Sequence, residues 1–300
     1  MGEAKIRKMR SMSTTTVNIR AHYLHIVEWL PSNQRQTGTE LYSRLKNHER
    51  FTVVLDRCVS KADVFKALER VAENCQAGRN PIVHFESHGD GRNPEWSEGL
   101  VGPAEDSAEE LLSWSELAPI LRHLNLLTRF NLQMVAAACY GGSAISAIEA
   151  PMAMPFTATL GFIGKVNPSD LFNAMRELYR AMLNGCAGDA SIESAQRELP
   201  EGCHLHFETA HTLAHQLMSM YARDHLNPTS LRERAERYLA HGRQSDISMN
   251  LERATNLIRN VSIEGLQKAV PIWFAFDQIP ENRERFRFDF KRILAHATSN

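Results

Sequence analysis

Residues 81–90 read PIVHFESHGD, an apolar run of strand character that ends in a histidine and a glycine. A second apolar run, residues 132–139, reads LQMVAAAC, and one tyrosine and two glycines follow its terminal cysteine. Short apolar runs bounded by turn residues are typical of strands buried on both faces of a parallel sheet. Three more runs have this character: Tyr23–Leu30, Phe51–Leu55 and Phe156–Ile163.

Segments with helical periodicity separate these runs. The clearest is Ser60–Cys75, in which apolar residues recur on one face and Ser60 stands as an N-cap. Ser113 and Glu116 have the spacing of a capping box near the start of another helix, Leu111–Leu124. Strands that alternate with helices predict an α/β fold, with a mainly parallel sheet flanked by helices.

Composition divides the chain into three segments. Residues 1–19 are basic and rich in Ser and Thr, and we expect a flexible N-terminal segment there. Residues 20–200 hold the alternating strands and helices, with Asp90–Glu110 as an acidic, turn-rich loop or hairpin at the rim of the sheet. Residues 201–300 show no further strand and predict a helical C-terminal region. Its expected helices are His204–His225, Ser230–His241, Ile247–Val261 and Glu264–Phe276.

Charge and cysteine usage exclude several classes of protein. The 34 Lys and Arg residues nearly balance the 35 Asp and Glu residues, so nucleic-acid binding through bulk charge is not expected. No apolar run approaches the roughly 18 residues of a membrane span, and no apolar leader follows the basic N-terminus, so we expect no membrane contact and a cytoplasmic location. Five cysteines without a CxxC pair argue against a disulfide framework and a zinc ribbon.

Other site patterns are weak or missing. Cys203, His204 and His206, and further on His211 and His215, invite a metal interpretation because histidines four residues apart share a helix face. No HExxH pattern accompanies them, so we interpret them as a polar helix face and expect no metal and no cofactor. A P-loop, a dinucleotide fingerprint and a Gly-x-Ser-x-Gly motif are all missing, which argues against nucleotide-dependent and serine-hydrolase chemistry.

The residues with catalytic potential lie where two of the expected strands end. In an open parallel sheet, functional residues gather at the carboxyl ends of the strands, and His88 and Cys139 are placed to form a thiolate–imidazole dyad there. Gly89 lets its N–H turn toward a substrate carbonyl, and with the N–H of Cys139 it would form an oxyanion hole. A buried cysteine and a loop histidine are the simpler interpretation of each residue alone. Their joint spacing and the glycines favour catalysis.

This ordered pattern resembles the caspase-like cysteine peptidases, in which a strand ending in His-Gly precedes a strand ending in Ala-Cys by about 50 residues. The segments that extend the resemblance to the CHAT and separase-like branch are EGLV at 98–101, LSWSEL at 112–117 and GFIG at 161–164. The resemblance covers roughly residues 20–200, which it marks as a caspase-like peptidase domain. It implies endopeptidase cleavage carried by His88 and Cys139.

The resemblance also implies which residues surround P1, the substrate residue before the cleaved bond. Its pocket is walled near the cysteine strand and the loop after the fifth strand, which points to Ala137, Phe162 and Asp170. Ala137 supplies no charge where metacaspases carry an acidic residue. Asp170 would attract Arg or Lys, although its place in a helix's first turn is explained more simply by the helix dipole. An apolar or small P1 residue against Phe162 and the alanines stays as open as a basic one.

Two classes of function follow. The first is a cysteine endopeptidase that cleaves specific protein substrates in a regulatory or defence pathway, with a regulatory protein as a possible partner. The second is a catalytically silent caspase-like module that binds a partner through its helical C-terminal region. Intact His88 and Cys139 favour the enzyme, because a silent module is free to lose either.

Overall fold

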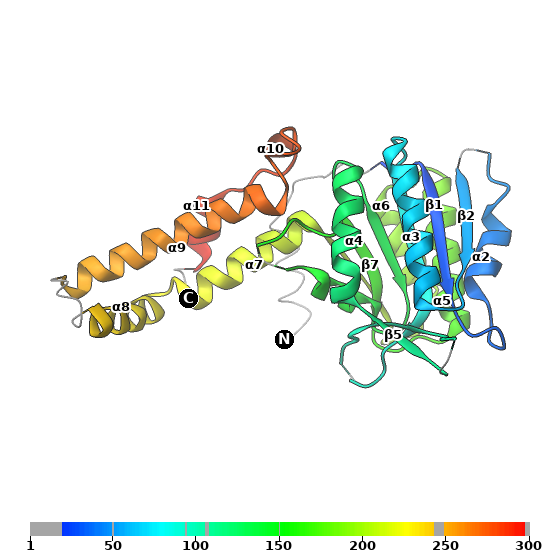
Figure 1. Ribbon diagram of the computed structural model, residues 1–300, viewed down its shortest axis with the longest axis horizontal. Coiled ribbons are helices and arrows are strands. Elements are labelled where there is room, and N and C mark those ends of the chain that lie inside the picture. Colours follow the sequence, from blue (N-terminus) through cyan, green and yellow to red (C-terminus); the bar gives the residue numbers. More distant parts are fainter. Residues whose placement is uncertain are drawn as a thin grey trace. The chain divides into compact units, whose positions relative to one another are not determined.

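The computed structural model describes residues 20–49, 51–93, 95–105, 108–149, 151–242 and 249–297. The N-terminal segment expected over residues 1–19 lies outside the described residues. The described chain forms two compact units, of which one contains the sheet and ends at Thr209 and the other consists mainly of residues from Ala210 onward. Figure 1 traces the elements of both units in chain order.

The first unit is built around a mixed sheet of eight strands. The six that form its main path are β1 (Tyr23–Trp29), β2 (Thr52–Arg57), β3 (Pro81–Gly89), β6 (Gln133–Ala137), β7 (Ala158–Ile163) and β8 (His204–Thr209). They follow the order β2-β1-β3-β6-β7-β8, and every neighbouring pair is parallel except β7 with β8. The five apolar runs all form strands, and the predicted fold class is confirmed. This architecture is consistent with a caspase-like α/β fold.

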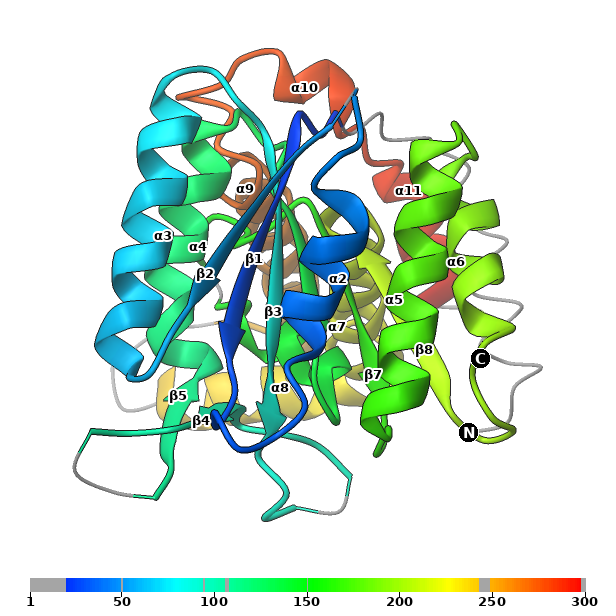
Figure 2. The ribbon, with the colours of Figure 1, turned by 90° about the vertical axis from the view of Figure 1, so that its right-hand side faces the viewer.

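Helices cover both faces of the sheet (Figure 2). They are α2 (Thr37–Leu45), α3 (Lys61–Gln76), α4 (Trp114–Leu127), α5 (Pro168–Leu183) and α6 (Gly188–Gln196). Helices α3 and α4 lie side by side on one face, and α2, α5 and α6 lie on the other. Ser60 caps α3 by accepting a hydrogen bond from the backbone N–H of Asp63, and Ser113 and Glu116 form the predicted capping box of α4.

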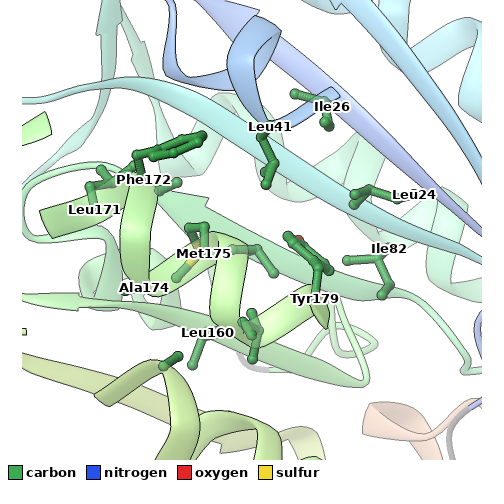
Figure 3. Close-up of a cluster of buried hydrophobic side chains, with 14 of the residues drawn as sticks. Leu24, Ile26, Leu41, Ile82, Leu160, Leu171, Phe172, Ala174, Met175 and Tyr179 are labelled. Carbon is green, nitrogen blue, oxygen red and sulfur yellow. The ribbon is translucent and has the colours of Figure 1, made fainter. Parts of the chain in front are cut away.

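A core of buried apolar side chains fills the space between the sheet and helices α2 and α5 (Figure 3). Because side chains alternate along a strand, Leu24 and Ile26 of β1 face this layer together with Ile82 of β3. Met175 and Tyr179 stand one turn apart on α5 and are almost completely buried among them. This packing fixes the start of α5 near the carboxyl ends of the central strands.

The acidic stretch after β3 forms a hairpin at the rim of the sheet. Of the two predicted forms, a loop or a hairpin, the structure has the hairpin. Its strands, β4 (Gly99–Gly102) and β5 (Glu110–Ser113), pair with each other in antiparallel fashion, and β4 also pairs antiparallel with the last two residues of β3, His88 and Gly89. Ser97 anchors the hairpin from within, because its buried hydroxyl accepts the N–H of Asp90 at 2.8 Å and its carbonyl accepts the indole N–H of Trp114 at 3.0 Å.

Two predictions about the later chain are wrong. The segment expected to begin the helix His204–His225 forms strand β8 at the antiparallel edge of the sheet, and only Ala210–His225 is helical (α7). The sequence HLHFET alternates polar and apolar residues, which is the period of a strand. The helices expected at Ile247–Val261 and Glu264–Phe276 form one helix, α9 (Leu251–Trp273).

The second unit is helical, and its further helices are α8 (Pro228–Gly242), α10 (Asn282–Arg285) and α11 (Phe290–Ala297). Helix α8 packs on α9, and α11 packs on α7. Phe274 and Phe286 stack with ring centroids 4.4 Å apart, and both are fully buried, so this aromatic cluster is core. Within the described ranges, none of the helices combines the length and apolar composition needed to cross a membrane.

Candidate active site

The parallel pairing of β3 with β6 brings His88 and Cys139 to one place. The register sets Glu86 beside Ala137, and His88 and Cys139 each follow two residues later. Gly89 packs directly on the backbone of Cys139, since a Cβ on this glycine would stand 1.8 Å from the Cys139 carbonyl oxygen. His88 and Cys139 line one pocket of about 310 Å³. The two strand ends therefore meet as the sequence predicted.

Four segments that are distant in sequence line this pocket. Besides His88 and Cys139, its lining includes Gln34, Arg35 and Thr37 before and within the start of α2, Glu86 on β3, Ala137 on β6, and Val166 before α5. Ala137 and Glu86 are almost completely buried, whereas the Arg35 side chain is 37% exposed. Ala137 and Glu86 thus form the floor of the pocket, and Arg35 stands at its rim.

Cys139 differs from the other cysteines in its surroundings. Three of the five are buried (Cys58, Cys75 and Cys203), and Cys186 is exposed. Burial raises the pKa of both Cys58 and Cys75 to about 12, so these thiols stay protonated at neutral pH. Cys139 is half-buried, and its Sγ lies 3.5 Å from the backbone N of Val166. The same Sγ lies 3.6 Å from the carbonyl oxygen of Val166, so the sulfur faces both backbone groups of that residue.

His88 is oriented by a side chain on the loop between β1 and α2. Its Nε2 lies 2.7 Å from Oε1 of Gln34. An amide oxygen only accepts hydrogen bonds, so Nε2 carries the ring proton in this arrangement and Nδ1 is the basic nitrogen. The loop is itself fixed, because the Gln34 N–H donates to the Pro31 carbonyl at 3.0 Å and the Gln36 amide donates to the Gln34 carbonyl at 3.0 Å. Gln34 is therefore a positioning residue for His88.

A chain of buried polar groups runs beneath the pocket. The Tyr179 hydroxyl lies 2.8 Å from His84 Nδ1, His84 Nε2 lies 2.9 Å from Glu86 Oε1, and the Thr37 hydroxyl donates to Glu86 Oε2 at 2.6 Å. All four side chains are buried. Burial and the nearby Glu86 carboxylate raise the pKa of Tyr179 well above its ordinary value, so the tyrosine keeps its proton. The chain joins α5, β3 and α2 under the candidate dyad.

The residues expected around the substrate fall in different places. Ala137 lies on the pocket floor. Phe162 is fully buried in the core and is not among the pocket-lining residues. Asp170 lies in the first turn of α5, where its carboxylate accepts the side-chain amide of Asn167, the N-cap of that helix. Gly89 packs against Cys139, and the oxyanion hole formed by their N–H groups stays a prediction.

Sequence reasoning missed Glu86, Gln34 and Thr37. Glu86 carried a usable signal, because it interrupts an apolar strand two positions before His88 and therefore shares its face. Gln34 lies in a loop without a recognisable pattern. Thr37 begins a helix and contacts Glu86 only through the tertiary fold.

The side chains around the pocket limit the chemistry that the site can support. In the part of the chain that the structure describes, no group of three or more His, Cys, Asp or Glu side chains is arranged to hold a metal ion. A thiol, an imidazole and an orienting amide around one pocket are the groups of nucleophilic catalysis. Comparison of the sequence with protein-family models and with curated proteins gives no match.

Proposed function

We propose that this protein is a cysteine endopeptidase in which Cys139 is the nucleophile and His88 is the general base and acid. One observation carries the proposal. A half-buried cysteine and a histidine oriented by Gln34 line the same pocket, at the ends of adjacent strands whose backbones touch at Gly89. Neither residue belongs to the cluster of buried apolar side chains between the sheet and helices α2 and α5.

The reaction assigned to this pair has two halves. The Cys139 thiol gives its proton to Nδ1 of His88, and the thiolate attacks the carbonyl carbon of the scissile peptide bond. The C–N bond then breaks, the proton on His88 passes to the leaving amine, and the acyl group remains on sulfur as a thioester. His88 next takes a proton from water, the hydroxide attacks the thioester, and the C–S bond breaks to return the thiol and release the carboxylic acid.

The resemblance to caspase-like peptidases supports the same roles and suggests the setting. We infer specific protein substrates, cleaved in a regulatory or defence pathway, and a regulatory protein partner in that pathway. A cytoplasmic location belongs to the proposal as well, because the five cysteines are unpaired and a thiolate nucleophile persists in a reducing compartment. The N–H groups of Gly89 and Cys139 would stabilise the oxyanion.

The proposal is tested with Cys139→Ala and His88→Ala in a proteome-derived peptide library. Each change should lower cleavage by several orders of magnitude, because loss of the nucleophile or base removes the same chemical step. Melting temperatures should stay close to that of the wild type, since both side chains face the pocket. Cys186→Ala, which removes an exposed cysteine, is the matched control and should leave cleavage unchanged. Substantial proteolysis by purified Cys139→Ala would contradict the assignment, and a wild type without activity would favour the silent module.

A further inference from the structure

We infer that a second pocket beside His88 binds the part of the substrate that follows the cleaved bond, and that its acidic lining favours an arginine or a lysine there. The residues after the cleaved bond are called P1′, P2′ and P3′ in chain order. The inference rests on the proposed peptidase function and adds the leaving-group side of the substrate to it. The residues expected around P1 do not line this second pocket.

The second pocket has a volume of about 520 Å³ and lies between the end of β3 and the β4–β5 hairpin. It is lined by His88, Asp90 and Arg92 on one side and by Val101 and residues 109–111 on the other, and we call it the hairpin pocket. Among the described residues, His88 is the one that lines both the hairpin pocket and the pocket of Cys139. The two pockets therefore meet at the imidazole.

A row of side chains leads from His88 into the hairpin pocket. His88 is directly opposite Val101 in the antiparallel pair of β3 with β4, and Val101 is directly opposite Leu111 in the pair of β4 with β5. Directly opposite residues of paired strands have their side chains on the same face. Val101 and Leu111 therefore continue the face of His88 as an apolar floor.

This floor extends from His88 in the direction away from Cys139. Cys139 follows β6, and the sheet order places β6 on one side of β3 and β1 on the other. Gly102 of β4 packs on the ring of Trp29 at the end of β1, since a Cβ on Gly102 would stand 2.2 Å from that ring. At the level of Val101 the hairpin thus lies on the β1 side of β3, with His88 between it and Cys139.

The proposed reaction determines which part of the substrate reaches the hairpin pocket. His88 gives a proton to the leaving amine, so the nitrogen of the cleaved bond lies between the Cys139 sulfur and the imidazole. The peptide attached to this nitrogen continues past the imidazole, where the hairpin pocket begins. An extended chain advances about 3.3 Å per residue, so P1′ to P3′ span about 10 Å of this path.

Acids outnumber bases in the lining of the hairpin pocket. It has the carboxylates of Asp90, Glu109 and Glu110 and the guanidinium of Arg92. Arg92 donates to Asp90 at 2.8 Å and to Glu98 at 3.0 Å, so two carboxylates share its charge. The hydrogen bond from Arg92 lowers the pKa of Asp90 below its ordinary value, which keeps this acid charged at neutral pH. The balance of charge in the pocket is therefore negative.

The lysine behind β5 does not reverse this balance. The Nζ of Lys61 makes an ion pair with Glu116 and donates to the Leu111 carbonyl at 3.1 Å. Its backbone N–H donates to the carboxylate of Glu110 at 3.3 Å. Glu109 is exposed and Glu110 is half-buried, so solvent screens their attraction for a substrate cation and the expected preference is moderate.

The test determines the residues on both sides of each cleaved bond in one experiment. A peptide library prepared by cutting a proteome after acidic residues keeps arginines and lysines internal. We expect Arg and Lys at P1′ to P3′ of the cleaved peptides to be enriched about fivefold over the library. The double variant Glu109→Gln, Glu110→Gln should bring this enrichment close to one and leave the P1 preference unchanged. Its amide at position 110 still accepts the Lys61 N–H. Glu105→Gln makes the same charge change in the same hairpin outside the pocket and should keep the enrichment.

A second measurement needs no variant of the protein. The most rapidly cleaved peptide with a basic residue at P1′ to P3′ is compared with a copy that has norleucine at that position, and kcat/KM should fall about fivefold. An unchanged kcat/KM contradicts the inference, also if the double variant does not fold. No enrichment in the wild type, an enrichment that survives the double variant, or one that Glu105→Gln abolishes would overturn the role of the hairpin pocket and leave the peptidase intact. A wild type that cleaves no peptide would overturn the peptidase and this inference with it.

Discussion

Replacing Gly89 with alanine should force apart the two strand ends that hold the candidate dyad. The added Cβ would stand 1.8 Å from the carbonyl oxygen of Cys139, whereas real Cβ atoms essentially never come within 3.0 Å of such an atom. The backbones of β3 and β6 would therefore have to separate by about 1.2 Å, and no flexible side chain is available to absorb the change.

This displacement determines how much stability and how much activity the variant should lose. Overpacking of backbone against backbone costs about 2 to 3 kcal/mol, which corresponds to a fall in melting temperature of roughly 5 to 10 °C for a domain of this size. A shift of about 1 Å between nucleophile and base lowers a reaction rate about a hundredfold. Gly89→Ala should therefore lose more activity than its stability predicts.

The assay is the rate of Cys139 alkylation by a peptidyl probe in the Cys186→Ala background, together with thermal denaturation. Gly91→Ala is the matched control, because a Cβ at Gly91 meets nothing within 4 Å, and it should leave both quantities unchanged. If Gly89→Ala has the melting temperature of the wild type and its Cys139 is alkylated at the wild-type rate, the close approach of the two strand ends is refuted.

Two further predictions concern the orienting amide and the pH dependence of stability. Gln34→Leu removes the acceptor of the His88 Nε2 proton and should slow Cys139 alkylation about tenfold. Gln34→Glu should retain the alkylation rate and move the alkaline limb of its pH profile to higher pH, because a carboxylate favours the imidazolium form of His88. Equal rates in the wild type and both variants would contradict the positioning role of Gln34. Burial lowers the pKa of His25 below its ordinary value of 6.5, so the unfolded chain binds this proton more readily than the folded chain and stability is lost as the pH falls through about 6.5. Melting temperatures should thus fall between about pH 7.5 and pH 5.5, less so in His25→Gln, and an identical fall in both proteins would exclude His25 as the cause.

Most strands of the sheet could be predicted from local sequence patterns. Central parallel strands are apolar on both faces, so runs such as PIVHFE can be recognised as strands before the strands that pair with them are known. Ser60, Ser113 and Glu116 act within one helical turn, and the structure has all three as predicted. Strand β8 was missed because its six residues run directly into the longer helix α7, whose periodicity dominates the region.

The candidate site was predictable only in part, for a physical reason. His88 and Cys139 end strands, and parallel strands end at one edge, so their meeting follows from the fold class. The buried polar groups beneath the pocket are brought together by contacts that no local pattern encodes. Glu86 accepts the hydroxyl of Thr37, which is 49 positions away, and His84 is hydrogen-bonded to Tyr179, which is 95 positions away.

The central position of β3 and β6 in the sheet determines which parts of the site can unfold locally. Both strands have hydrogen-bonded neighbours on either side, so amide protons near His84 and Val135 should exchange with solvent only when the whole sheet opens. The backbone of the loop that carries Gln34 is held by hydrogen bonds within the loop, such as the one from the Gln34 N–H to the Pro31 carbonyl, so it can open without the sheet and at lower cost. Slow deuterium uptake within β3 and β6 beside faster uptake in that loop would describe a rigid support under His88 and Cys139, with the orientation of His88 set by a segment of a few residues.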